Sequence, residues 1–272
     1  MLLILVPALL LCLAMSAAWA LRQKGAASGW IDVIWSASVG VTALSTIFAV
    51  GGDSDRKAVI AGMVIVWSAR LAAHIALRAR STSDDPRYVA LEAEWGASAP
   101  RRLLMFLQIQ AVAGLVLVVS LAIAAANPSP FPNIFDCLGA PVFVAGWIGE
   151  TLADAQLRAF SRTEKNNRAV CEVGLWRWSR HPNYVFEWLI WCAPAIVALA
   201  RINSYPLGII ALAAPAMMYA LLARISGVPP LEAHMLKSRG EVYRDYQRRV
   251  PAFFPLLKRA RKTSSETGGG QA

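Results

Sequence analysis

The sequence predicts an all-α membrane protein, a bundle of about seven transmembrane helices with its N-terminus outside and its C-terminus in the cytoplasm. Of the 272 residues, 57% are apolar and only 16% are charged, and the mean hydropathy is +0.47. A helix needs about 20 apolar residues to cross a hydrocarbon core of ~30 Å, and the chain offers seven runs of that kind. None alternates with a period of two, so helices are favoured over the strands of a barrel. Helices also satisfy their own backbone hydrogen bonds inside lipid.

The expected helical domain is a single integral-membrane unit over residues 1–257, followed by a polar, glycine-rich tail at 258–272 that is expected to be disordered. The first run lacks the basic start of a signal peptide, so we expect it to stay as a span. The seven spans are expected near 1–21, 30–50, 58–77, 103–126, 134–157, 184–201 and 205–225.

The distribution of basic residues predicts the orientation. The net charge is +10, and with the N-terminus outside, 23 of the 27 Lys and Arg residues lie in the inner segments. That asymmetry is the positive-inside rule. Because topology and contact with membrane lipids explain the basic charge, no nucleic-acid partner is expected.

Two inner segments are expected to form helices at the membrane surface. One is a short interfacial helix that begins near Asp84, Asp85 and Pro86. The other is an amphipathic helix near 230–250, where apolar residues recur at helical spacing between basic ones. The four cysteines are scattered, with no CxxC and no cluster with His at ligand spacing. We therefore expect neither a structural disulfide nor a metal site.

Ionisable and amide side chains recur in the cytoplasmic halves of the spans. Such residues are costly in a membrane and usually mark a functional site. Each could also be structural, as a helix anchor at the headgroups or an i,i+4 ion pair. Their coincidence on several helices favours one polar cavity that opens to the cytoplasm. These residues are Asp32, Arg70, His74, Glu150, Asp154, Arg158, Asn183, Glu187 and Arg224.

The stretch GLWRWSRHPNYVFEWLIW, residues 174–191, places Arg177, Arg180 and His181 just before an apolar helix. Pro182 suits the first turn of that helix, and a helix start favours anions. Arginine binds phosphate through paired donors. This layout favours a cofactor that carries phosphate, and neither a GxGxxG fingerprint nor a Walker loop is present.

This stretch, together with the segment from Gly146 to Phe160, resembles the C-terminal half of the steroid 5α-reductase family, closest to its bacterial membrane members. The resemblance is strong over about 140–200, weaker over 200–257 and only topological over the first 130 residues. The RHPNY core is shared with sterol Δ14-reductases and isoprenylcysteine carboxyl methyltransferases, which use a related membrane fold.

The resemblance implies a seven-helix bundle in the bacterial inner membrane that binds NADPH from the cytoplasm. An apolar steroid, or another enone lipid, would enter from the bilayer and be reduced at its carbon–carbon double bond. By matching motif, the NADPH contacts would be Asp154, Arg158, Asn183, Glu187 and Trp191. Arg70, Arg168 and Arg224 match family arginines, and Arg162, Arg180, His181 and Tyr184 are added on charge and position.

The family holds the 3-oxo group of its substrate with an acid on the second span and a tyrosine on the third. Asp32 falls at the acid position, where a protonated carboxyl could donate a hydrogen bond. Trp67 lies near the place of the tyrosine; its indole N–H can donate a hydrogen bond but cannot deliver a proton. Tyr88 in the following loop is a possible substitute donor.

Two other functions stay open. The closing segment EAHMLKSRGEVYRDYQRRVPAFFP resembles the tail of the methyltransferases as much as that of the reductases, which leaves an S-adenosylmethionine-dependent methyltransferase as the alternative. The basic residues between Arg158 and Arg180 favour NADPH, because S-adenosylmethionine carries no phosphate. A sterol- or lipid-binding protein without catalysis is the third possibility.

Overall fold

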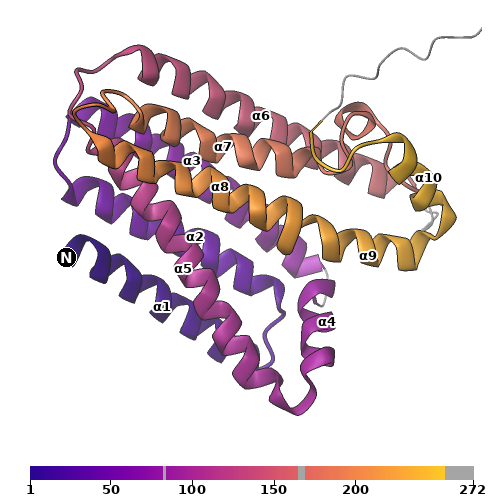
Figure 1. Ribbon diagram of the computed structural model, residues 1–272. Coiled ribbons are helices and arrows are strands. Elements are labelled where there is room, and N and C mark those ends of the chain that lie inside the picture. Colours follow the sequence, from indigo (N-terminus) through magenta and orange to yellow (C-terminus); the bar gives the residue numbers. More distant parts are fainter. Residues whose placement is uncertain (82–83, 165–168, 255–272) are drawn as a thin grey trace, which may run out of the picture.

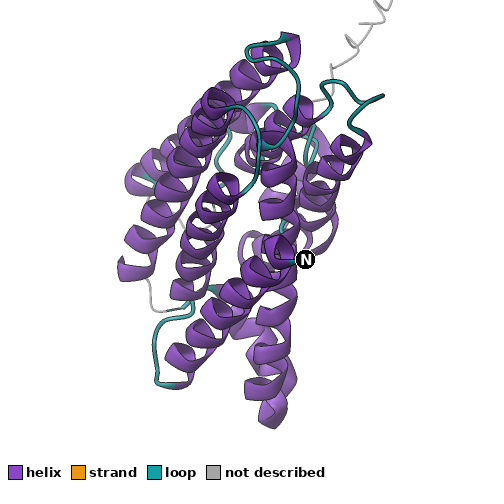
Figure 2. Ribbon diagram, turned by 90° about the vertical axis from the view of Figure 1, so that its left-hand side faces the viewer, coloured by secondary structure: helices purple, strands orange, loops and turns teal. Residues whose placement is uncertain are grey.

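All the regular structure of the computed structural model is helical in the residues that it describes, which are 1–81, 84–164 and 169–254 (Figure 2). The all-α prediction is therefore confirmed. The first half contains α1 (Leu2–Gln23), α2 (Gly29–Ala49), α3 (Ser54–Ser81), α4 (Pro86–Trp95), η1 (Gly96–Ser98) and α5 (Ala99–Ala125). The second contains α6 (Ile134–Thr163), η2 (Gly174–Arg177), α7 (Pro182–Ala198), η3 (Pro206–Leu212), α8 (Ala213–Tyr219), η4 (Ala220–Ile225), α9 (Val228–Arg239) and α10 (Glu241–Arg249).

The long helices run side by side, and α5 crosses the bundle obliquely (Figure 1). Among the neighbours, α6 packs against α7, α2 against α3, and α1 against both α2 and α5. The short helices α4, α9 and α10 lie at the end of the bundle opposite the N-terminus (Figure 1). We call this the α4 end, and the other the N-terminal end.

Five helical stretches of the described chain are long and apolar enough to cross a membrane, which supports a multi-pass membrane protein. They are Leu2–Gln23, Gly29–Ala49, Ser54–Arg80, Pro86–Ala125 and Pro206–Arg239. The two other runs that the sequence predicts as spans correspond to α6 and α7. Helix α7 has only 17 residues, and α6 extends six residues past the expected end at 157 and carries charged side chains along its length.

Glycines allow α6 and α7 to approach closely. A Cβ atom on Gly146 would lie 2.9 Å from the carbonyl oxygen of Phe186 and 3.0 Å from the backbone nitrogen of Ile190. A Cβ on Gly139 would lie 2.9 Å from the carbonyl oxygen of Ala193. Small residues at such an interface let helix backbones meet without a side chain between them.

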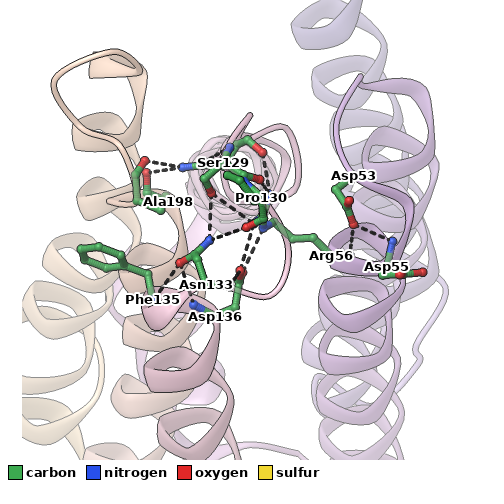
Figure 3. Close-up of polar contacts among 11 residues, drawn as sticks. Asp53, Asp55, Arg56, Ser129, Pro130, Asn133, Phe135, Asp136 and Ala198 are labelled. Atoms are coloured by element: carbon green, nitrogen blue, oxygen red, sulfur yellow. Dashed lines mark hydrogen bonds and ion pairs between the residues drawn. The ribbon is translucent and has the colours of Figure 1, made fainter.

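A buried arginine joins α3 to α6 at the N-terminal end. Arg56 is 1% exposed and forms two hydrogen bonds of 2.9 Å with the carboxylate of Asp136 (Figure 3). Its guanidinium also donates to the carbonyl oxygens of Asn127, at 2.7 Å, and Ser129, at 2.9 Å. A side chain that the sequence places in an outer loop is thus a satisfied ion pair inside the protein.

Of the two predicted surface helices, the first is present and the second is divided in two. Helix α4 begins at Pro86, and Asp85 caps it by accepting a hydrogen bond from the backbone N–H of Arg87, as the sequence predicts. The prediction of a single amphipathic helix near 230–250 is wrong, because this segment forms two helices, α9 and α10. Gly240 separates them and adopts a φ of 59°, a backbone conformation that favours glycine. Their apolar side also packs on the protein itself, where Tyr243 and Tyr246 are buried against Val170 and Met235. The predicted tail at 258–272 lies outside the described residues.

We expect Gly146→Ala to destabilise the protein, because the new methyl group must push α7 away from α6. Overpacking of this kind costs about 1–3 kcal/mol, and each kcal/mol lowers Tm by about 2–4 °C in a chain of comparable size. The matched control is Gly62→Ala on α3, where a Cβ meets nothing within 4 Å. Thermal unfolding of the detergent-solubilised protein would compare the two. An equal Tm in both variants would contradict close α6–α7 packing.

Candidate functional site

A cluster of charged side chains lies between α3, α6 and α7, toward the α4 end. We call it the Arg70 cluster; its members are Arg70, His74, Glu150, Asp154, Arg158, Asn183 and Glu187. Arg70 on α3 pairs with both Glu150 and Asp154 on α6, and its Nη1 lies 2.9 Å from Oδ2 of Asp154. These three side chains are at most 12% exposed. Seven of the nine predicted polar residues thus meet from three helices, whereas Asp32 belongs to a separate group and Arg224 is not a member.

Helical spacing explains why these groups meet. Glu150, Asp154 and Arg158 are four residues apart on one face of α6, and Arg70 and His74 are four apart on α3. The two stripes face each other. Arg158 approaches Nδ1 of His74 at 2.6 Å, and the same ring nitrogen lies 3.7 Å from Asp154. Because a guanidinium can only donate, Nδ1 accepts this hydrogen bond.

Two indoles hold the carboxylate of Glu187. Trp67 on α3 donates its N–H to both oxygens, at 3.0 and 3.1 Å, and Trp191 donates to Oε1 at 2.9 Å. All three side chains are buried, and the two indole rings meet edge to face at 4.8 Å. The sequence places Trp67 against the substrate ketone. In the structure its N–H points at Glu187 instead, so that role is corrected.

Several polar atoms of the Arg70 cluster lack a partner. Nε of Arg70 and Oε2 of Glu150 are buried without a hydrogen bond. A buried polar group in that state costs about 1–3 kcal/mol. The amide of Asn183 lies 3.5 Å from Asp154, at the outer limit of a hydrogen bond. The cluster thus keeps hydrogen-bonding capacity that a polar ligand could use.

A second group of polar residues surrounds Asp32 on α2. Arg87 donates to Asp32 at 2.6 Å, and the hydroxyl of Tyr88 donates to it at 2.8 Å. Gln110 on α5 in turn donates to the Tyr88 oxygen at 3.2 Å. Both carboxylate oxygens of Asp32 therefore accept hydrogen bonds. In this contact Tyr88 carries the donated hydrogen, whereas the sequence predicts a donor at Asp32.

Asp85 holds Arg87 in place. Nε of Arg87 lies 3.0 Å from Oδ1 of Asp85. Burial by itself raises the pKa of the Asp85 carboxyl, but hydrogen bonds from Arg87 and the positive charges of Arg87 and Arg78 outweigh it, so that the pKa ends below its ordinary value. Asp85 therefore stays ionised at neutral pH and orients the guanidinium that binds Asp32.

The sequence predicts that Arg180 and His181 face a bound cofactor. In the structure they contact another part of the protein instead. Both bind Glu232 on α9: Nε of Arg180 lies 2.6 Å from Oε1, and Nε2 of His181 lies 3.0 Å from the same oxygen. Tyr184 stacks on His181 with ring centres 5.5 Å apart. These side chains fasten α9 to the start of α7.

The remaining predicted residues are all arginines. Arg158, Arg162 and Arg224 are exposed, and no hydrogen bond or ion pair is found for the last two within the described residues. Arg168 lies outside the described residues. The four cysteines are free. Within residues 1–81, 84–164 and 169–254, no group of three or more His, Cys, Asp or Glu side chains could hold a metal ion.

Sequence reasoning missed the partners Arg87 and Glu232, although both lie in segments that it singled out. Arg87 follows the cap residues of α4, and it reads as one more basic residue of an inner loop. Only the fold brings it to Asp32, 55 positions away. The sequence does mark Glu232, because it is a lone acidic residue near the start of a basic helix.

We expect Arg70→Met to lower stability strongly, because Glu150 and Asp154 would keep their buried carboxyls without the guanidinium. Removing one partner of a buried ion pair costs about 3–5 kcal/mol. Arg162→Met is the control, since Arg162 lies exposed near the end of α6, the helix that carries the two carboxylates. Thermal unfolding should show a large loss for Arg70→Met alone. Similar curves for both variants would show that the pairing contributes little.

We expect Glu232→Gln to loosen α9 and α10, because it removes the charge that holds both Arg180 and His181. Hydrogen exchange followed by mass spectrometry should show faster exchange over 228–249 and little change in α1 or α2. Glu241→Gln on α10 is a matched control, because its carboxylate is exposed and pairs with Arg244 alone among the described residues. Equal exchange in the two variants would contradict a docking role for Glu232.

A comparison with protein families finds one match. The family model described as "Protein of unknown function (DUF1295)" matches residues 18–250. That range extends from the last turn of α1 through α10 and contains every residue of the Arg70 cluster. No curated protein and no solved structure matches the chain.

Proposed function

We propose that this chain, which belongs to the DUF1295 family, is an NADPH-dependent membrane reductase of the carbon–carbon double bond in an enone lipid. The substrate that we propose is a Δ4-3-oxo-steroid, which would be reduced at the 5α position. The observation that carries the proposal is the Arg70 cluster. Arg70, Asp154, Glu187 and Trp191, which the resemblance to the steroid 5α-reductases assigns to NADPH, meet at one buried place from three helices.

The residues present fit this cofactor. The unpartnered Nε of Arg70 and Oε2 of Glu150 offer a donor and an acceptor to an amide or a ribose. Arg158 and Arg162 are exposed near the end of α6, and arginine offers the paired donors that phosphates prefer. When bound, NADPH supplies a hydride to the alkene carbon of the substrate.

On the substrate side, Tyr88 and Asp32 have the roles that the geometry supports. Negative charge develops on the ketone oxygen as the double bond is reduced, and a fixed hydrogen-bond donor stabilises it. Tyr88 is the group with a hydrogen to donate and to transfer. The hydroxyl has one hydrogen, which it donates to Asp32 in the structure, so on substrate binding it would turn this hydrogen from Asp32 to the ketone oxygen, while Gln110 still donates to the hydroxyl oxygen. In this proposal Tyr88, from the segment after the third span, takes the place of the tyrosine that the span lacks.

The proposed topology has seven crossings, with α6 and α7 added to the five apolar stretches. Helix α6 can cross in spite of its charges because Arg56 and Arg70 pair with them. The α4 end, which carries the basic inner segments, would face the cytoplasm, and the N-terminus would lie outside. The membrane would be the inner membrane of a bacterium.

The second candidate is an S-adenosylmethionine-dependent methyltransferase of the isoprenylcysteine type. One observation keeps it open: the tail, which resembles those enzymes as much as the reductases, docks through Glu232 directly onto Arg180 and His181 of the RHPNY motif. The exposed arginines favour NADPH over this alternative.

The first test is turnover of the purified protein in detergent, with NADPH and a Δ4-3-ketosteroid such as progesterone. We expect loss of absorbance at 340 nm and a product two mass units heavier. Binding of S-adenosylmethionine without binding of NADPH would overturn the reductase proposal. Binding of neither, with a sterol retained, would favour a lipid-binding protein without catalysis.

We expect Tyr88→Phe to lower kcat about 100-fold or more, the usual scale for loss of a proton donor, while the Kd for NADPH stays the same. Tyr205→Phe is the control, because its hydroxyl donates to the carbonyl oxygen of Ile123 far from Asp32. Stopped turnover in both variants, or a change only in the NADPH affinity, would contradict the role of Tyr88.

A further inference from the structure

An apolar pocket lies between α3, α6 and α7, on the N-terminal side of the Arg70 cluster. Its volume is about 210 Å³, and Met63, Phe131, Ala140 and Val197 are among the residues that line it. An apolar cavity of about 150 Å³ takes up a benzene ring, whereas sites for drug-sized molecules begin at about 300 Å³. The pocket is therefore wide enough for one hydrocarbon chain and too small for a set of four fused rings.

The two charged residues of the lining offer nothing to a polar ligand. Arg56 and Asp136 border the pocket, but they bind each other, and the other guanidinium hydrogens go to Asn127, Ser129 and Pro130 (Figure 3). A ligand that needs hydrogen bonds would have to break this network. The chemistry of the pocket thus selects hydrocarbon.

The lining of the pocket overlaps with that of a small void beside the candidate site. A second void, of about 10 Å³, shares Met63 with it and ends on Trp67 and Trp191, the two indoles that hold Glu187. At a rise of about 1.5 Å per residue, the stretch of α3 from Arg56 to Trp67 is about 16 Å long, roughly half of the ~30 Å core of a bilayer. Met63 separates the two spaces, and its unbranched side chain adapts easily to a new neighbour.

We propose that this pocket binds the hydrocarbon tail of the lipid substrate, with Met63 as the movable side chain between the tail and the Trp67–Trp191 pair. The proposal rests on the proposed function for the identity of the head group. The tail enters from the N-terminal half of the bundle, and the cofactor enters from the α4 end. The substrate class is then an enone with a single flexible chain at the end away from the reacting bond, and in a Δ4-3-oxo-steroid of this kind the fused rings would lie outside the pocket.

The test uses the full chain in phosphatidylcholine nanodiscs and two photoreactive probes. One is a long-chain enone with a diazirine at the chain end, and the other is a phosphatidylcholine with the same diazirine tail. After irradiation, peptide mapping by mass spectrometry locates the labelled residues. We expect the enone probe to label residues 59–63 and 137–140, and the phospholipid probe to label mainly the outer faces of the helices.

Ala140→Phe should fill the pocket and reduce this labelling about tenfold. Val144→Phe, one turn further along α6 on an exposed position, is the matched control and should not change it. Labelling that is insensitive to Ala140→Phe, or equal for the two probes, would overturn the proposal in favour of ordinary bilayer lipid. The Kd for NADPH, measured on the same samples, separates the two proposals. Binding of NADPH without labelling of the pocket rejects the tail site alone, and labelling without NADPH binding rejects the reductase alone.

Discussion

A charge inside the bundle must be paired, and the pairing of Arg70 is the constraint on which the arrangement of α3, α6 and α7 depends. Its guanidinium binds carboxylates of α6, and Trp67, three residues earlier on α3, binds the carboxylate of α7. Breaking a buried pair leaves an uncompensated charge, which costs several kcal/mol. The relative positions of these three helices are therefore set by side-chain chemistry as well as by apolar packing.

The close contact of α6 and α7 allows side chains of α7 to reach the acidic residues of α6. Gly139, Gly146 and Gly149 present no side chain to α7. As a result, Asn183 and Glu187 approach the acidic stripe of α6 directly. A larger residue at these positions would separate the helices and remove Glu187 from the neighbourhood of Arg70. The packing that stabilises the pair thus also assembles the candidate site.

The two buried arginines of α3 divide the bundle into two chemically different halves. Arg56 is fully satisfied and closes the N-terminal end (Figure 3). Arg70 lies nearer the α4 end, and its buried Nε has no hydrogen-bond partner. The apolar pocket lies between them. This order, from a fully paired arginine through an apolar pocket to a polar cluster with unpartnered atoms, is what the proposed reaction between an apolar lipid and a charged cofactor requires.

Periodicity in the sequence determined the helices, the charged stripes of α3 and α6 and the start of α4, because each depends on residues within a few positions of one another. The sequence also singled out most of the candidate site, including Arg70, Asp154 and Glu187. Only the tertiary structure decided which groups bind which. Arg87 reaches Asp32, Trp67 reaches Glu187, and Glu232 reaches Arg180 and His181. Each of these partners is more than 50 positions away from the other in the chain. An ion pair or hydrogen bond between helices depends on how the helices are rotated and how closely they approach, and local spacing carries no record of either.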